Sequence, residues 1–295
     1  MASAKEIKAQ IGSINNTKKI TRAFEMIAAS KMKKARDRMD AGRPYATRMR
    51  EVILHVSGAH AEFNHPYMQS RPVKKIGLIV ISTDRGLCGG LNINLFKLVL
   101  TEFKRCQKEN IEIELGIIGK KAEDFSRRIG GDIVSYAHHL GDAPSVSDII
   151  GSVNVMLTNF KESKIDQLYL LGNEFISTIS QKPFCRQLLP ILTEEIKKSL
   201  GEDKTDEEKR YWDYIYEPDA KTLLTLLLER YVESQVYHAV VENVACEQAA
   251  RMIAMKNASE NAGDIINDLS LQYNKARQAA ITKELAEIVS GSDAV

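Results

Sequence analysis

Apolar residues recur at alternating steps of four and three along the last part of the chain, which is the spacing of a heptad seam on a long helix. No proline follows Pro218, so the last 77 residues are free to form a helix, and Pro218 with Asp219 stands where a helix start is expected. At about 1.5 Å per residue, such a helix is roughly 115 Å long. The seam consists of Tyr237, Val241, Val244, Met255, Ala258, Ala262, Ile265 and Leu269, with the polar residues Gln248 and Arg251 at the two intervening positions.

A second long helix is predicted at the other end of the chain. Ser3 and Glu6 have the spacing of a capping box, which indicates that the helix begins there. Pro44 is expected to bend or end this helix, although apolar residues continue the pattern after it. The apolar stripe begins with Ile7, Ile11 and Ile14 and, after a change of phase, continues with Ala28, Met32, Ala35 and Met39.

Neither terminal helix can bury its apolar stripe alone. The economical arrangement pairs the helix in residues 1–58 with the helix in residues 218–295 as an antiparallel coiled coil that projects from the middle of the chain. Both ends of the chain then lie in the rod. We therefore expect an α/β fold class with a long antiparallel two-helix coiled coil, formed by the N- and C-terminal helices.

Residues 70–217 have the alternating pattern of a central α/β domain. Runs of Val, Ile and Leu separated by amphipathic stretches are typical of a mostly parallel, Rossmann-like sheet that is covered by helices on both faces. Further strands are predicted at 176–181 and 211–216, on either side of a charged loop at 194–210. The other strands are expected at 73–82, 111–118, 131–136 and 165–172, and the helices at about 91–108, 121–129 and 145–163.

The stretch TDRGLCGGLN, at residues 83–92, connects a predicted strand to a predicted helix, which is the layout that holds phosphate in nucleotide-binding proteins. It lacks the lysine and the hydroxyl of a P-loop, and its glycines do not have the spacing of a dinucleotide fingerprint. A nucleotide-dependent enzyme is therefore disfavoured, and a weak anion site stays open. Two other interpretations are a tight turn in which Asp84 caps a helix or pairs with Arg85, and an exposed contact surface that presents Arg85 and Cys88.

Other catalytic or metal sites find little support in the pattern of residues. The four cysteines are far apart and make no Cys-x-x-Cys pair, so reduced, buried thiols are expected. The adjacent His138 and His139 point different ways on a helix or a strand, so we expect no metal there. No apolar run reaches the roughly 18 residues that span a bilayer, and the N-terminal stretch lacks a secretory signal, so the chain is expected in the cytosol.

The net charge is only +2, but it is unevenly distributed. Residues 1–50 carry thirteen Lys and Arg against four Asp and Glu, whereas residues 219–295 carry seven against eleven. The basic N-terminal segment suggests a second class of function, binding to nucleic acid. However, its cations run round the predicted helix among Met and Ala, and neither a recognition module nor an aromatic stacking surface accompanies them.

Four segments together resemble the gamma subunit of the F-type ATP synthase, and the resemblance covers the whole chain. In the last segment, five residues match the family signature, whereas Ser292 stands where alanine is common. The segments are KEIKAQIGSINNTKKITRAFEMIAASKMKKA, STDRGLCGGLN, RMIAMKNASENA and ITKELAEIVSG, and the five matching residues are Ile281, Thr282, Glu284, Glu287 and Gly291.

This resemblance implies the central rotary shaft of a proton-translocating bacterial ATP synthase. The coiled coil would stand inside the ring of alternating alpha and beta subunits, and the α/β domain would rest with the epsilon subunit on the membrane-embedded ring of c subunits. Proton flow would turn ring and shaft together, and the shaft would drive the beta sites through the conformations of ATP synthesis. The resemblance implies no catalytic residue, cofactor or metal in this chain, and a peripheral position on the cytoplasmic face of the inner membrane.

The resemblance also implies a set of contact residues. A rod that turns in its bearing favours small and polar surface contacts over a large apolar interface, and cations can attract an acidic loop at any angle. The positions near the acidic lever loop of the beta subunits are Met26, Lys33 and Arg36, with Arg85 and Cys88 from the glycine-rich turn, and those that the family uses for hydrogen bonds to beta-subunit loops and to its own coil are Arg251, Gln278, Thr282 and Glu284.

Overall fold

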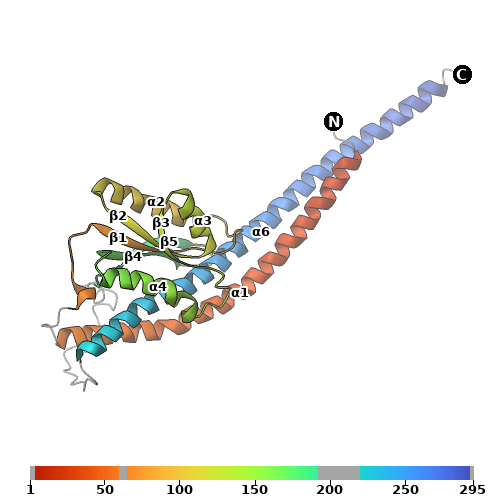
Figure 1. The fold of residues 1–295 in the computed structure, drawn as a ribbon. Helices are drawn as coiled ribbons and strands as arrows, with labels where there is room; N and C mark the ends of the chain where they lie inside the picture. The colour runs from red at the N-terminus through yellow and green to blue at the C-terminus, as the bar shows by residue number, and fades with distance from the viewer. Residues whose placement is uncertain (1–3, 60–64, 192–219, 293–295) are drawn as a thin grey trace. The chain divides into compact units, whose positions relative to one another are not determined.

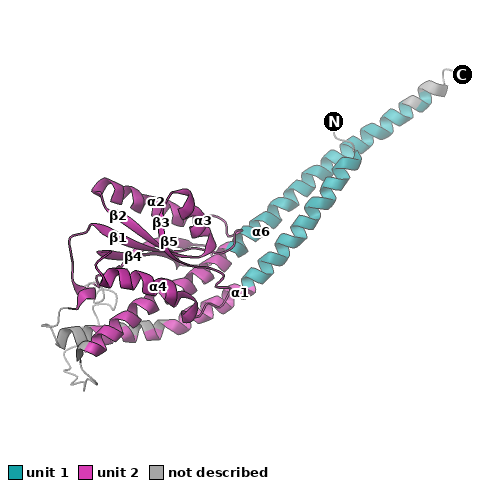
Figure 2. Cartoon of the chain, in the orientation of Figure 1, with its two compact units in different colours: residues 1–29, 251–295 teal, residues 30–250 magenta. Residues whose placement is uncertain are grey.

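The computed structural model describes residues 4–59, 65–191 and 220–292, which belong to two compact units. Unit 1 contains residues 1–29 and 251–295, and unit 2 contains residues 30–250 (Figure 2). Two long helices, α1 (Ala4–Ala59) and α6 (Ala220–Ser292), contribute residues to both units (Figure 1). Each unit therefore has its own packing, which is described separately.

Unit 2 is built on a five-stranded sheet with the strand order β3-β2-β1-β4-β5. The first four strands of the chain pair in parallel, and β5 adds an antiparallel edge beside β4. This mixed sheet confirms the expected α/β class. The strands are β1 (Lys75–Ile81), β2 (Glu112–Ile118), β3 (Asp132–Ala137), β4 (Gln167–Phe175) and β5 (Gln181–Leu189).

The two faces of the sheet are covered by different helices. Alternate side chains of β1 point to opposite faces, so Leu78 packs in one core and Ile79 in the other. Helices α2 (Leu91–Glu109) and α3 (Lys120–Arg128) contribute Leu95 and Ala122 to the first core. The second core contains Phe160 of α4 (Val146–Lys161) and Leu228 of α6. The first half of α6 is thus part of the α/β layer structure.

Two glycines let α4 approach the sheet closely. A Cβ atom at Gly77 would lie 2.6 Å from the side chain of Met156, and one at Gly116 would lie 3.1 Å from the same residue. Real Cβ atoms essentially never make a contact as short as the one at Gly77, so a larger residue there would force the end of the Met156 side chain to move. The packing of this face therefore depends on the absence of side chains at these two strand positions.

The predicted strand at 176–181 is wrong. Residues 176–180 form the turn between β4 and β5, and the edge strand begins at Gln181. Pro183 lies inside β5, where it faces Asn173 of β4. Proline is tolerated at this position because only one side of an edge strand is paired. The strand predicted at 211–216 and the charged loop at 194–210 lie outside the described residues.

Unit 1 is an antiparallel pair of helices formed by residues 4–29 of α1 and 251–292 of α6 (Figure 2). Ile7 and Ala28 of α1 are buried in this pair, as are Met255 and Ala262 of α6. The fold class predicted from the two ends of the chain is thus confirmed. The division into segments at 1–58, 70–217 and 218–295 stays a prediction.

The predicted change of phase in the seam of α1 is wrong. Residues at alternating steps of four and three stay buried or half-buried without a break from Ile7 to Met39, and the stretch between Ile14 and Ala28 is filled by polar residues. Long polar side chains can lie along a seam with their polar ends near water. The polar members of the seam are Lys18, Thr21 and Glu25.

The seam predicted for α6 is also partly wrong. Val241, Val244, Met255 and Ala262 are buried as expected, but Ile265 is 47% exposed. The neighbouring Ile266 is half-buried instead. A straight helix drifts relative to a strict heptad repeat, which accounts for a seam that moves by one residue along its length.

Pro44 does not end α1, whose helical span continues to Ala59. Proline removes one backbone hydrogen bond to the carbonyl four residues earlier, and the exposed side of a helix lets water replace it. Pro44 is exposed. The capping box predicted at Ser3 and the helix start at Asp219 lie outside the described residues.

Candidate functional site

The loop at 83–92 is held by side chains of its own. The amide of Asn92, in the first turn of α2, donates to the hydroxyl of Thr83 at 2.7 Å, and that hydroxyl donates to the carbonyl of Arg85 at 2.6 Å. The backbone N–H of Thr83 donates to the Asn92 side-chain oxygen at 3.3 Å. Thr83 and Asn92 are both buried. The loop is therefore a fixed turn between β1 and α2.

Asp84 occupies the position that an anion would take beside α3. Its carboxylate accepts the backbone N–H of Lys120 at 3.0 Å and that of Leu140 at 3.2 Å. Asp84 thus caps a helix, but this helix is α3 and not the helix that follows its own turn, and its pairing with Arg85 is not observed. A carboxylate at a helix N-terminus is stabilised by the first N–H groups and the helix dipole.

The other N–H groups of the first turn of α3 also have partners. Lys121 donates to the carbonyl of Thr83 at 3.0 Å, Ala122 to the hydroxyl of Ser82 at 2.8 Å, and Glu123 to the carbonyl of Gly119 at 3.4 Å. A helix N-terminus binds phosphate through N–H groups that are otherwise unsatisfied. Together with the N–H group of Lys120, which Asp84 accepts, all four N–H groups of this turn are engaged by the protein itself.

Gly119 permits this closed arrangement between β2 and α3. Its φ angle is +100°, a conformation that residues with a side chain rarely adopt. A Cβ atom at this position would clash with the backbone carbonyl of Ser82. The glycine therefore allows β1 and the start of α3 to meet, and it serves packing here.

Two cations of α3, Lys120 and Arg127, are also engaged. The ammonium of Lys120 lies 2.8 Å from a carboxylate oxygen of Glu123 and 3.5 Å from one of Asp124. Arg127 contacts Glu123 from the next turn at 2.9 Å. The hydrogen bond from Lys120, together with the one from Arg127, lowers the pKa of Glu123. These charges stabilise α3 as a helix and are not gathered on a ligand.

The glycine-rich loop packs against α6. Cys88, Leu91 and Cys246 form one buried cluster, and Phe175 and Ala250 pack on it. The thiol of Cys246 donates to the carbonyl of Asn173 at 3.5 Å, and burial raises the pKa of this thiol. Within unit 2, this turn therefore packs the α/β domain against α6.

Cys88 does not face outward as expected, because its side chain is only 3% exposed. The residue before it is the exposed one. Leu87 is 66% exposed and has a φ of 64°, which is uncommon for a residue with a large side chain. Arg85 is exposed as predicted. The exposed side chains of the loop are therefore those of Arg85 and Leu87, beside its exposed glycines.

The loop that follows β3 is tied to both long helices. The carboxylate of Asp142 lies 2.6 Å from the ammonium of Lys31 on α1, and it accepts from Gln248 of α6 at 3.4 Å. The guanidinium of Arg38 donates to the backbone carbonyl of Asp142 at 2.8 Å. One acidic residue of the α/β domain thus joins two cations of the basic N-terminal helix.

The predicted contact residues of α1 lie on its surface. Met26 is 63% exposed, Lys33 is exposed, and Arg36 lies 3.8 Å from Asp40. Met26 belongs to unit 1, whereas Lys33 and Arg36 belong to unit 2. Among the described residues, no hydrogen bond or ion pair joins these three to one another, so their role as a joint surface stays a prediction.

The predicted contact residues of α6 are also accessible. Gln278, Thr282 and Glu284 are exposed, and Arg251 is half-buried. Gln278 and Thr282 are four residues apart and share a face of the helix, while Glu284 points elsewhere. Their hydrogen bonds to other subunits stay predictions.

The structure also reveals exposed apolar surface on unit 1, whereas the sequence predicted small and polar contact residues there. The exposed apolar residues of unit 1 follow one another at helical steps, a signal that was present in the sequence. On α1 they are Ile20, Phe24 and Ile27, and on the end of α6 they are Ile281, Leu285, Ile288 and Val289. The expectation of a mainly small and polar surface is therefore wrong for this part of unit 1.

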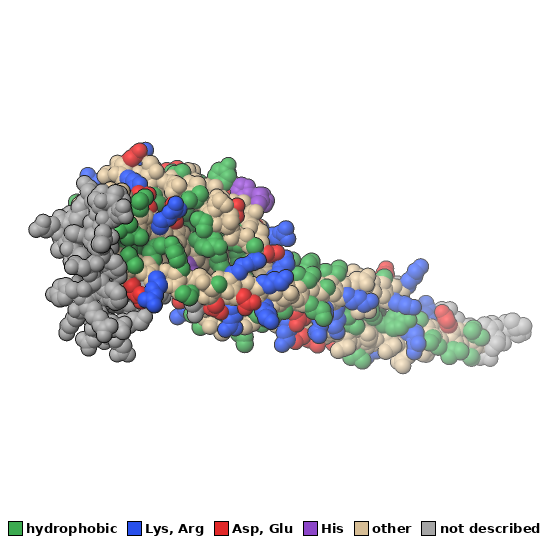
Figure 3. Space-filling view, turned by 90° about the horizontal axis from the view of Figure 1, so that it is seen from below, with side chains coloured by type: hydrophobic (Ala, Val, Ile, Leu, Met, Phe, Trp, Pro, Cys, Tyr) green, Lys and Arg blue, Asp and Glu red, His purple; other side chains and the backbone are tan. Residues whose placement is uncertain are grey.

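The space-filling view shows basic, acidic and apolar side chains interspersed along the helical surface of the described residues (Figure 3).

The four cysteines are free thiols, three of them buried and Cys185 partly exposed. Across the three described segments, no group of three or more His, Cys, Asp and Glu residues is placed to hold a metal ion. Among the helices that the structure describes, none has an apolar stretch long enough to cross a membrane.

Comparison with known proteins places these features in one family. The family model described as ATP synthase matches residues 3–295. The ATP synthase gamma chain of Coxiella burnetii (strain Dugway 5J108-111) is 56% identical over 297 residues, and that of Nitrosococcus oceani is 57% identical over 296 residues. Both alignments cover 100% of this chain and 100% of the relative.

Solved structures have the same fold. A chain of the central stalk and c-ring of the Tetrahymena thermophila mitochondrial ATP synthase is 27% identical, with a TM-score of 0.58 over 81% of this chain and 99% of that one. A chain of the Euglena gracilis mitochondrial ATP synthase is 20% identical, with a TM-score of 0.66 over 99% of this chain and 94% of that one. The family model and the full-length relatives lead to one conclusion: this chain belongs to the ATP synthase gamma chain family.

Proposed function

We propose that this chain is the central rotary shaft of a proton-translocating F-type ATP synthase. It couples rotation of the membrane c-subunit ring to conformational cycling of the catalytic beta subunits, in ATP synthesis or in proton pumping driven by ATP hydrolysis. Its partners are the hexameric ring of alpha and beta subunits, the epsilon subunit and the c-subunit ring. No nucleic acid is among them.

The observation that carries this proposal is the surface of unit 1. Large apolar side chains point outward from both helices, and the last turns of α6, from about residue 277 on, are exposed wherever their side chains are described. Exposed apolar surface of this kind marks a site of contact with another protein. If the helix pair enters a ring of partner subunits, that ring would cover this apolar surface.

The chain is proposed to be a non-catalytic subunit of the enzyme complex. The 83–92 loop is held by hydrogen bonds between Thr83 and Asn92, and the neighbouring first turn of α3 is engaged by Asp84, Ser82 and Thr83. ATP chemistry then belongs to the beta subunits, and no cofactor is needed here. The chain would be peripheral, on the cytoplasmic face of the bacterial inner membrane, and held there by its partners.

The proposed coupling surface has two parts that differ in chemistry. Lys33, Arg36 and Arg85 offer cations from unit 2, which can attract an acidic lever loop at any angle of rotation. Met26, Arg251, Gln278, Thr282 and Glu284 belong to unit 1 and contact the beta subunits along the coil. We propose three functional segments: the helix in 1–58, the α/β domain in 70–217 and the helix in 218–295.

Reconstitution tests the shaft itself. The purified chain alone is expected to have no ATPase activity, and its addition to alpha and beta subunits of a close relative is expected to give an assembled complex that hydrolyses ATP. The measurement combines gel filtration with an ATPase assay. If the three components do not assemble, or if the chain hydrolyses ATP by itself, the proposal fails.

Coupling is tested by Met26→Lys in membranes that contain the whole complex. The added charge stands where the shaft meets the beta subunits, so we expect assembly and hydrolysis to persist while proton pumping per ATP falls severalfold. The matched control is Lys5→Met on the same helix, which alters charge and length near the start of α1. Unchanged pumping per ATP in the Met26 variant would argue against this contact.

A further inference from the structure

A cavity of about 300 Å³ lies in unit 2 between α1, α6 and the beginning of α4. Its floor includes the buried residues Met39, Glu233 and Val241, and its mouth includes Tyr45 and Val146, which are both exposed. Pockets for small molecules begin at about this volume. An engineered apolar cavity of about 150 Å³ holds one benzene ring, so this one has room for about two fused rings.

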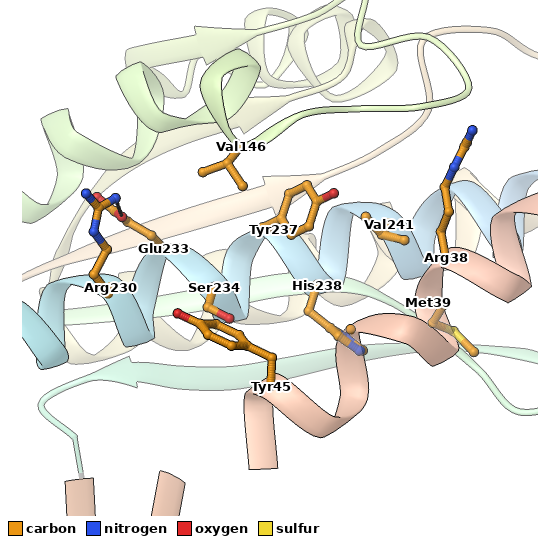
Figure 4. Close-up of a pocket in the computed structure, with 11 residues that line it drawn as sticks. Arg38, Met39, Tyr45, Val146, Arg230, Glu233, Ser234, Tyr237, His238 and Val241 are labelled. Carbon is orange, nitrogen blue, oxygen red and sulfur yellow. Dashed lines mark hydrogen bonds and ion pairs between the residues drawn. The ribbon is translucent and has the colours of Figure 1, made fainter. Parts of the chain in front are cut away.

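The walls of the cavity combine aromatic and aliphatic surface. Figure 4 shows Val146 and Tyr237 on one side of the cavity and Tyr45 with His238 on the other. The hydroxyl of Tyr237 donates to the carbonyl of Pro144 at 3.4 Å, which holds the ring against the start of α4. Aromatic side chains favour stacked or edge-to-face contacts with another ring. A flat aromatic molecule is therefore the shape that these walls accept.

The charged residues of the lining stand at the two ends of the cavity. At one end Arg230 donates to Glu233 at 2.8 Å, so that these two charges balance (Figure 4). At the other end the Arg38 guanidinium uses one nitrogen to donate to the Asp142 carbonyl. An arginine has five N–H donors in a planar fork, and the remainder of this fork can hold a carboxylate. The lining therefore has an excess of one positive charge near Arg38.

The cavity lies beside a point where α1 and α6 are in contact. A Cβ atom at Gly42 would lie 3.5 Å from the imidazole of His238, which is ordinary van der Waals contact. Gly42 thus lies next to α6 beside the cavity, and α4 lines its third side. A molecule in this place would contact three helices at once.

We infer that this cavity is a binding site for a small aromatic carboxylate of about two fused rings. Its ring system stacks between Tyr237 and Tyr45, and its carboxylate is held by Arg38 at the entrance. The site is separate from the contact residues of the shaft, so its existence does not depend on the proposed rotary function.

The experiment uses naphthalene-2-carboxylate as the probe and the full chain as the receptor. Isothermal titration is expected to give one site with a Kd on the order of 0.1 mM, which is typical for a ligand of this size. The neutral analogue naphthalene-2-methanol is expected to bind at least fivefold more weakly. Arg38→Gln is expected to abolish the difference between the two probes.

Two tryptophan variants on the same helix locate the site. Val146→Trp fills the mouth of the cavity and should weaken binding of naphthalene-2-carboxylate more than tenfold. Val155→Trp changes a residue of α4 that is 38% exposed, against 40% for Val146, and lies outside the cavity, so binding should be unchanged. Circular dichroism checks that both variants are folded, and Ser234→Met, which fills the cavity from α6, replaces Val146→Trp if that variant is not.

Three results would overturn the inference. They are full binding by the folded variant with a filled cavity, equal loss in the two tryptophan variants, and absence of saturable binding in the parent chain. Equal affinity of the acid and the alcohol for the parent chain would overturn the assignment of the carboxylate to Arg38.

Discussion

The two units of the chain differ in how they distribute their large apolar residues. In unit 2 the large aliphatic side chains, such as Leu78 and Ile79, are fully buried between the sheet and its helices. In unit 1 the seam contains small and polar residues, among them Ala28 and Glu25, whereas large residues such as Leu285 point outward. Unit 2 has the composition of a self-sufficient domain core, and unit 1 has the composition of a surface that another protein covers.

This contrast predicts that equal truncations have unequal effects. Leu78→Ala in unit 2 should lower the free energy of unfolding by about 2–5 kcal/mol, because it leaves a cavity in a packed core. Leu285→Ala in unit 1 should change it by less than about 0.5 kcal/mol, because that side chain is already exposed. Urea unfolding of the full chain, followed by circular dichroism, measures both. Similar losses in the two variants would contradict the proposed difference between the units.

Thiol reactivity is expected to differ between the units as well. Burial raises the pKa of Cys185, at the edge of the unit 2 core, to about 11, and the carboxylate of Glu102 adds to this shift. An exposed thiol introduced by Ile20→Cys in unit 1 should have an ordinary pKa of about 8.5. At pH 8, iodoacetamide should therefore modify Cys185 at least about a hundredfold more slowly.

The pH dependence sharpens this test because the two thiols ionise in different ranges. The rate at Cys185 should rise about tenfold per pH unit from pH 8 to pH 10, while the rate at the introduced thiol should level off above about pH 9. Mass spectrometry of labelled peptides separates the two sites. If the modification rate of Cys185 levels off in the same pH range as that of the introduced thiol, the environment of Cys185 does not raise its pKa.

The smallest expected effect concerns the polar seam of unit 1. One carboxylate oxygen of Glu25 is buried without a hydrogen bond among the described residues, and Arg22 lies 3.8 Å away. Glu25→Gln removes the charge from this partly buried position. We therefore expect the free energy of unfolding of unit 1, measured by thermal unfolding, to rise by up to about 1 kcal/mol. Glu260→Gln, which changes an exposed residue of α6, is the control and should have little effect. A clear loss in the Glu25 variant would mean that the charge stabilises the seam.

Much of the fold was predictable because its signals are local. The alternating α/β pattern located α2 to within one residue at its end, and the heptad spacing located both long helices. The edge strand β5 was missed because Pro183 and nearby cations are unfavourable for a strand, and only the pairing with β4 makes this segment an edge. Likewise, the continuity of the α1 seam through Lys18 and Glu25 depends on how long polar side chains lie, which hydropathy does not describe.

The candidate site was less predictable because its decisive contacts join distant parts of the chain. Asp84 was expected to act within its own turn, but its partners are 36 and 56 residues further along. The burial of Cys88 depends on Cys246, which only the fold brings close. The exposed residues Ile281, Leu285 and Ile288 were recognisable from their spacing, but a helical apolar stripe is usually assigned to a buried seam.

Asp84 has a mechanical consequence beyond its role as a cap. Through Leu140 it holds the loop after β3, and two residues further along that loop Asp142 contacts Lys31 and Gln248 on the two long helices. A force applied to the exposed face of the 83–92 loop would therefore be transmitted to α1 and α6 through these hydrogen bonds and the ion pair of Asp142. The apolar contacts of Cys88 with α6 would transmit it as well. The carboxylate at the start of α3 thus helps to connect the 83–92 loop mechanically to both long helices within unit 2.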